Sequence, residues 1–341
     1  MATAPPQSPP SLNLCAILSL SKRIINAHSR HFLALAVLFL LPLSFSFTVF
    51  PTLQTLLADH FPNNSQIFIS LDDHPHHHHR RQPQIPTKTL LLALAYAVFV
   101  FLFSLCAVGS ITCSVFHGFF GRPVKLLSAV GSIIASFFPL LFTALIVQII
   151  VAVISVIFAL FVFLVISAIR LLGFQIEYSS PYFLGFCGAL GIALLLVLVY
   201  LQVNWTLVSV IVVVEKSWGF ESLRRSAGLI RGIRGTALSL LLFFGLFAAL
   251  LAWCSSFSAM VLDDVSDGWR KLEFVVQIVV TSTFLTIVLL YNVAATAVLY
   301  MYCKAVHGEL AMEIAEEFAR EYVCLPFDEG KVPHVVSVAY A

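Results

Sequence analysis

The chain has 341 residues, of which 60% are hydrophobic and 11% are charged, and its mean hydropathy is +0.98. Soluble domains carry about 25% charged and about 45–50% apolar residues, so this composition excludes a water-soluble domain. The net charge of +2 gives no reason to expect nucleic acid as a partner. No two of the seven cysteines have CxxC spacing, which argues against a zinc site or a disulfide framework.

The first 31 residues do not have the order of a cleaved signal peptide. The basic pair Lys22-Arg23 follows the apolar stretch 12–20 instead of preceding it. We therefore interpret residues 1–31 as a cytosolic N-terminal segment, in which 12–31 form an interfacial helix that leads into the first span.

Six uncharged runs are long enough to cross a membrane, since a spanning helix needs about 20 apolar residues. The lipid core demands that backbone hydrogen bonds close within the segment, and no strand-like alternation is visible. The predicted fold class is therefore all-α, a polytopic membrane protein with six transmembrane helices and cytosolic interfacial helices. The membrane domain covers 32–303, with spans near 32–53, 89–115, 138–168, 182–213, 237–262 and 274–303.

The third run has an ambiguous length. Lys125 and Arg170 bracket 44 uncharged residues, which is long for one helix and short for two helices with a turn. Proline suits the start of a helix, so we expect one span after Pro139, with 123–135 as a partly apolar interfacial helix.

The distribution of basic residues predicts the orientation. With the N-terminus in the cytosol, thirteen lysines and arginines lie inside and six outside, as the positive-inside rule favours. Two spans in the third run would move the arginine-rich segment 214–235 outside, against that rule. We expect both termini in the cytosol and the chain in an endomembrane, such as the endoplasmic reticulum, or in the plasma membrane.

The loop 54–88 is expected on the lumenal or extracellular face. Asn63 begins an Asn-Asn-Ser glycosylation motif. A histidine-rich stretch, 74–79, has the chemistry to bind a metal, but its polar, proline-containing surroundings favour a low-complexity segment without a metal. No cofactor is predicted.

Residues 304–341 are expected to form a cytosolic helix and tail. The helix is predicted over 304–323, continuing the sixth span, with a favourable Glu316–Arg320 pair. We hypothesise that this acidic helix docks on the basic segment 214–235.

The basic segment 214–235 supplies the candidate interaction residues, and nothing in it is catalytic. A single helix over 218–235 would place Phe220, Leu223, Ala227 and Ile230 on one face. Gly228 and Gly232 have the small-xxx-small spacing that permits close helix approach. The residues singled out for structure or interaction are Glu215, Arg224, Arg225, Ser226, Gly228 and Gly232.

Basic segments also precede the first, third and fifth spans at a spacing of about one hundred residues. This pattern is typical of three repeated hairpins, as some transporters contain. Charge alternation in an ordinary six-span protein would produce the same pattern.

Two stretches carry a resemblance to known proteins. One is the basic amphipathic segment that runs into Leu40-Leu41-Pro42-Leu43-Ser44, and the other is Val213-Val214-Glu215 followed by a small-and-basic helix with Ser226. The chain resembles an uncharacterised family of plant multi-pass transmembrane proteins. It is distantly similar to the membrane domain found beside some bacterial glycerophosphodiester phosphodiesterases. The resemblance implies the architecture and a plant origin, and no activity.

The spans contain no paired carboxylates, nucleophile with a base, or metal ligands, so we do not expect an enzyme. The leading hypothesis is a non-enzymatic scaffold or trafficking component, with the lipid bilayer and other membrane proteins as partners. The alternative is a transporter or channel for a neutral or lipidic solute. A carrier requires a continuous polar cavity at the spans' polar residues, whereas a scaffold has them mutually bonded; they are Gln148, Gln202, Asn204, Gln277 and Asn292.

Overall fold

The computed structural model describes residues 13–60, 87–121, 126–171, 181–261, 268–312 and 314. All regular elements in this part of the chain are helices. Six are long and apolar enough to cross a membrane, so the predicted all-α, six-span architecture is confirmed; they are Ser29–Pro51, Leu90–Phe119, Ser136–Leu171, Gly185–Val214, Arg234–Cys254 and Val275–Val306. Asn63, the histidine-rich stretch and the Glu316–Arg320 pair lie outside the described residues.

The N-terminal segment forms an amphipathic helix, α1 (Leu14–Ala27), which packs Ile17, Ile24 and Ile25 against the bundle. The first span follows as α2 (Ser29–Leu35), one wide π-helical turn η1 (Ala36–Leu40) and α3 (Leu41–His60). The wide turn stands directly before Pro42, whose ring clashes with the carbonyl four residues earlier in a regular helix.

The second span is α4 (Thr87–Phe119), and the third is one uninterrupted helix, α5 (Leu126–Leu171), of 46 residues. The prediction that this run forms one span, and not two, therefore agrees with the structure. The predicted start of the span near residue 138 agrees with the candidate span Ser136–Leu171, but residues 126–135 are continuous with this span and do not form a helix of their own. Pro139 lies inside α5, and at about 1.5 Å per residue the helix far exceeds the hydrocarbon thickness of about 30 Å.

The fourth span is interrupted. It consists of α6 (Pro181–Asn204) and a short α7 (Val208–Val214), with Trp205 and Thr206 in the turn between them. The sequence predicted a continuous span over 182–213, so this interruption is a feature of the tertiary structure. The remaining elements are α8 (Phe220–Leu229), α9 (Arg234–Val261) and α10 (Gly268–Val306).

Two helices end earlier than predicted. The single helix expected over 218–235 is divided, because Gly232 has a φ of 98° in the turn between α8 and α9. The expected continuation of α10 through 323 is broken at Gly308, where φ is 76°. A φ in this range is one that side-chain-bearing residues rarely adopt. The helices α1 and α8 precede the first and fifth spans, as the repeat pattern predicts, whereas the residues before the third span are, from Leu126 onward, part of α5 itself.

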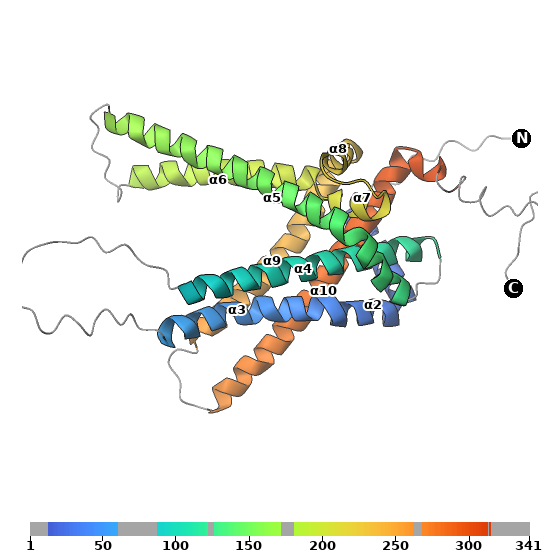
Figure 1. Ribbon diagram of the computed structural model, residues 1–341, viewed down its shortest axis with the longest axis horizontal. Helices are drawn as coiled ribbons and strands as arrows, with labels where there is room; N and C mark the ends of the chain where they lie inside the picture. The colour runs from blue at the N-terminus through green and yellow to red at the C-terminus, as the bar shows by residue number, and fades with distance from the viewer. Residues whose placement is uncertain are drawn as a thin grey trace, which may run out of the picture.

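The bundle has a packed body and a projecting arm (Figure 1). The body consists of α1–α4, α9 and α10, which share one buried apolar cluster. The arm is the α5–α6 pair. Within an apolar stretch of 18 residues in each span, the buried share is 39% in the first span and 33% in the sixth, but 0% in the third and 6% in the fourth. The arm therefore meets lipid along these apolar stretches. At its other end it is joined to the body by contacts of α5 with α4 and α7.

Polar side chains tie the body together where the first and last spans meet. Ser282 donates to the Thr48 hydroxyl at 3.2 Å, and Thr286 donates to the Ser44 hydroxyl at 3.0 Å. All four residues are buried. Such hydroxyl pairs stabilise helix contacts in lipid because neither partner has water available to it.

Candidate functional site

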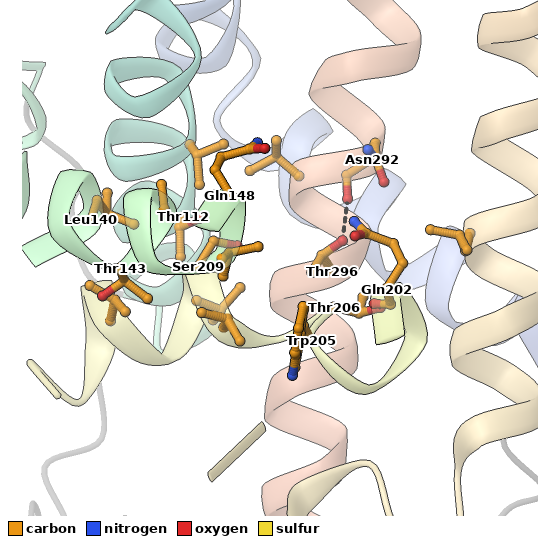
Figure 2. A pocket seen from close by; sticks show the side chains of 18 residues that line it. Thr112, Leu140, Thr143, Gln148, Gln202, Trp205, Thr206, Ser209, Asn292 and Thr296 are labelled. Carbon is orange, nitrogen blue, oxygen red and sulfur yellow. Dashed lines mark hydrogen bonds between the residues drawn. The ribbon is translucent and has the colours of Figure 1, made fainter. Parts of the chain in front are cut away.

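A cavity of about 320 Å³ lies where the arm meets the body (Figure 2). Its walls come from α4, α5, α6, the α6–α7 turn, α7, α9 and α10. We call it the amide pocket, because three side-chain amides line it beside apolar residues and hydroxyls. The polar lining residues are Thr112, Thr143, Gln148, Gln202, Thr206, Ser209, Asn292 and Thr296, with the indole of Trp205.

The three amides, on Gln148, Gln202 and Asn292, make no hydrogen bond through their side chains within the described residues. The Thr296 hydroxyl and the Thr206 hydroxyl bond only to carbonyls of their own chain segments. Thr112 is fully buried, and its hydroxyl has no hydrogen-bond partner. Leaving a buried hydroxyl such as that of Thr112 without a partner costs about 1–3 kcal/mol, whereas the side chains of Gln148 and Gln202 are exposed.

The other two polar residues expected to matter are satisfied by the protein. Gln277 donates to the Cys254 carbonyl at 3.1 Å and so joins α10 to α9. Asn204 is buried, and its side chain donates to the Tyr200 carbonyl at 2.7 Å. The predicted set therefore divides into three residues that line one cavity, one that joins two helices (Gln277) and one that bonds within its own helix (Asn204).

The helix interruption beside the pocket is stabilised by Ser226. Because Val208 bonds to the Trp205 carbonyl, the Asn204 carbonyl has lost its helical partner. The fully buried Ser226 hydroxyl donates to it at 2.7 Å. This bond satisfies an orphan carbonyl of the kind that every helix end leaves, and it fixes α8 beneath the turn. The sequence singled out Ser226 without assigning it a partner; its structural role is this bond to the Asn204 carbonyl.

A second bond connects the pocket wall to the turn before α8. The Thr143 hydroxyl donates to the Pro139 carbonyl at 2.8 Å and accepts from the Gly219 backbone N–H at 3.0 Å. Gly219 has a φ of 72°, and an added Cβ would lie 3.6 Å from both Phe142 and Ile146. Thr143 therefore links α5 directly to the start of α8.

Glu215, at the end of α7, is the centre of a charged network that we call the Glu215 cluster. Its Oε1 accepts a hydrogen bond from the fully buried Tyr300 hydroxyl at 2.7 Å. The ammonium of Lys304, a residue only 8% exposed, lies 3.9 Å from the same oxygen. Oε2 accepts from Arg225 Nε at 3.3 Å. The cluster joins α7 and α8 to α10.

Arg225 extends the cluster beyond α10 by a hydrogen-bonded ion pair with Glu309. The pKa of Arg225 lies above its ordinary value, first because Arg225 donates a hydrogen bond to the Glu309 carboxylate; burial opposes the shift, and the charges of the two carboxylates add to it. The expected contact between the acidic C-terminal segment and the basic segment 214–235 is thus present at this pair. Arg224 is exposed.

The proposed packing role of the glycines is wrong. An added Cβ at Gly228 or Gly232 would meet nothing within 4 Å, and Gly228 is exposed. The predicted face of the 218–235 segment is mostly confirmed: Leu223 and Ile230 are buried and Ala227 is half-buried, but Phe220 is 68% exposed. The α8 helix ends at Leu229, and the turn that contains Gly232 follows, so the predicted helical face does not continue towards residue 235.

The sequence did not single out Thr143, Tyr300 or Lys304, because each contributes through a contact with a residue distant in the chain. Within the described ranges, no group of three or more His, Cys, Asp or Glu could hold a metal ion.

Comparison with known proteins gives a family and no activity. No curated protein and no solved structure matches the chain. A family model matches residues 7–326, which include all six spans, the amide pocket and the Glu215 cluster. The chain therefore belongs to the family described as Domain of unknown function (DUF8558).

Proposed function

We propose that the chain is a carrier for a neutral solute that has both hydrogen-bonding groups and an apolar part, and that the solute binds in the amide pocket. The observation that carries the proposal is the set of polar groups on Thr112, Gln148, Gln202 and Asn292, which face one cavity without partners in the described residues. Polar groups at membrane depth face the bundle interior or a water-filled cavity, and a solute with hydroxyl or carbonyl groups would complete them.

The lining also supports the solute's neutral charge. None of the lining residues is Asp, Glu, Lys, Arg or His. An ion would leave water for a site without a counter-charge, which is costly at low dielectric. The remaining wall is made of valines, leucines and an alanine, which suits an acyl chain or ring. A neutral lipidic solute meets both requirements.

The interrupted fourth span supports a carrier. Discontinuous helices form the substrate sites of many transporters, because freed backbone groups and side chains meet there. Here the interruption at Trp205–Thr206 lines the pocket itself. The contacts of α5 with α4 and α7 lie at the pocket end of the arm, so a movement of the arm against the body would change access to the pocket.

The carrier would be oriented with the Glu215 cluster in the cytosol, since the charge distribution favours that side for the basic segments. Its membrane would be that of the endoplasmic reticulum or the plasma membrane. The transport role is non-enzymatic, because the pocket lining contains no side-chain base beside a nucleophile.

A scaffold or trafficking component is the second candidate. The observation that favours it is the outward surface of α8 and the turn before it, where Trp218 is 58% exposed, Phe220 is 68% exposed and Arg224 is also exposed. Aromatic and arginine side chains are enriched in protein interfaces. Loss of partner capture in cells after Phe220→Ser and Arg224→Ser, with solute binding unchanged, would favour this role.

The test uses a monoacylglycerol as a neutral amphipathic probe and its charged counterpart, lysophosphatidic acid. Binding to the purified chain in micelles is followed through tryptophan fluorescence, since Trp205 lines the pocket. We expect saturable binding of the neutral probe only, and flux of the neutral probe into vesicles that contain the chain. Gln148→Leu and Asn292→Leu should each weaken binding by about fivefold to tenfold, the value of one hydrogen bond.

Two variants serve as controls. Gln277→Leu lies outside the pocket and should leave probe binding unchanged. Thr112→Val keeps the side-chain shape and removes an unpartnered hydroxyl, so it should weaken binding without lowering stability. Equal binding of both probes, or equal effects of Gln277→Leu and Gln148→Leu, would refute the proposal.

A further inference from the structure

A second cavity, of about 450 Å³, lies between α1, α9 and α10. We call it the aromatic groove. Its apolar lining comes from segments far apart in the chain: Leu18, Phe243, Phe244, Phe247, Ile287 and Val288. Phe247 is 44% exposed and Ile287 is 47% exposed. In a chain whose helices cross a membrane, such exposed side chains meet lipid tails, so the natural contents of this groove are hydrocarbon.

The groove has one charged residue, Lys22 of α1. Lys22 is exposed, and no carboxylate of the described residues lies within ion-pair distance of its ammonium. The local charge is one-sided, because residues 13–58 contain Lys22, Arg23 and Arg30 but no Asp or Glu. An anion is therefore the complementary group at this end of the groove.

A third feature is the hydroxyl of Tyr291, which lines the groove and has no hydrogen-bond partner within the described ranges. The groove thus combines an aromatic and aliphatic channel, an unpaired ammonium and an unpaired hydroxyl. Basic pockets between transmembrane helices bind the headgroups of anionic lipids, and the apolar channel extends that recognition to the acyl chain.

We propose that the aromatic groove binds one anionic glycerophospholipid, with an acyl chain along the phenylalanines of α9 and the phosphate at Lys22. The bound lipid would fill the surface between α1 and the helices α9 and α10 and so hold the amphipathic helix in place. This inference is independent of the solute that occupies the amide pocket.

The test measures lipid retained by the purified full-length chain in neutral detergent, by native mass spectrometry. Phosphatidylglycerol and phosphatidylcholine with the same acyl chains are compared. We expect one phosphatidylglycerol per chain to be retained in preference to phosphatidylcholine. Lys22→Gln should lower phosphatidylglycerol affinity about fivefold, the value of one lysine at an anionic headgroup, and Lys22→Arg should restore it.

Arg23→Gln is the matched control, because Arg23 adjoins Lys22 but does not line the groove. Ile287→Trp fills the channel from its exposed side and should abolish retention, with circular dichroism and gel filtration reporting that the fold is intact. Equal retention of the two lipids, or equal losses in Lys22→Gln and Arg23→Gln, would overturn the proposal. Displacement by soluble glycerol phosphate would identify a free-phosphate site and overturn it equally.

Discussion

The hydrogen bond from Tyr300 to Glu215 provides the sharpest test of the Glu215 cluster. Tyr300→Phe removes one hydroxyl from a fully buried residue and leaves the ring in place. A hydrogen bond to a charged group contributes about 1.5–3 kcal/mol to stability. Glu215 keeps its contacts with Arg225 and Lys304, and 20% of its side chain is exposed. We therefore expect the free energy of unfolding to fall by about 1–2 kcal/mol, towards the lower end of that range.

The measurement is reversible unfolding in mixed micelles with an increasing fraction of denaturing detergent, followed by circular dichroism. Tyr291→Phe on the same helix is the control, since its hydroxyl has no partner in the described residues, and it should change stability by less than about 0.5 kcal/mol. Glu215→Gln completes a double-mutant cycle with Tyr300→Phe. A coupling energy below about 0.5 kcal/mol would refute the reasoning, because additivity means that the two residues do not interact.

Three further predictions use the same unfolding measurement. Arg225→Glu should lower stability by about 2–3 kcal/mol, since it places a third carboxylate beside the two it now pairs with, while Arg224→Glu on the exposed side should stay within about 0.5 kcal/mol; similar effects would contradict the assigned pairing. Gly228→Ala should raise stability by about 0.5–1 kcal/mol, whereas Gly219→Ala should lower it by about 1–3 kcal/mol because of its positive φ; a loss at both positions would mean that the helix packs closely at Gly228. Ser226→Ala should cost about 1–3 kcal/mol by leaving a buried carbonyl unpaired at the end of α6, and no change would show that another donor serves it.

The amide pocket and the Glu215 cluster share structural elements. Thr143 lines the pocket and bonds to Gly219, and Ser226 bonds to the carbonyl at the interruption that lines it. The α8 helix and its first turn therefore contact the pocket wall at two points, and Arg225 of α8 bonds to Glu215, which in turn accepts from Tyr300 of α10. Because these bonds join the arm to the body, their rupture would be required for a large movement of the arm at this end.

The sequence by itself determined the number and type of spans. An uncharged apolar run of sufficient length has one stable solution in a bilayer, a helix that closes its own backbone hydrogen bonds. The same local reasoning identified α1, because its amphipathic period is visible within a single segment. It also identified Glu215, Arg225 and Ser226 as residues of interest, although it attached no partner to Ser226.

Only the tertiary structure decided where the fourth span is interrupted and which polar residues share a cavity. The run 182–213 is apolar throughout, and its interruption depends on a hydroxyl supplied by Ser226, 22 residues after Asn204. Glu215 and Tyr300 are 85 residues apart, and Gln148, Gln202 and Asn292 come from three different helices. Hydrophobic periodicity describes which segments enter the membrane, but pairing between distant segments depends on how helices cross. Gly228 and Gly232 show the same limit of sequence reasoning. Their spacing permits close approach of another helix, but an added Cβ at either position would meet no atom within 4 Å.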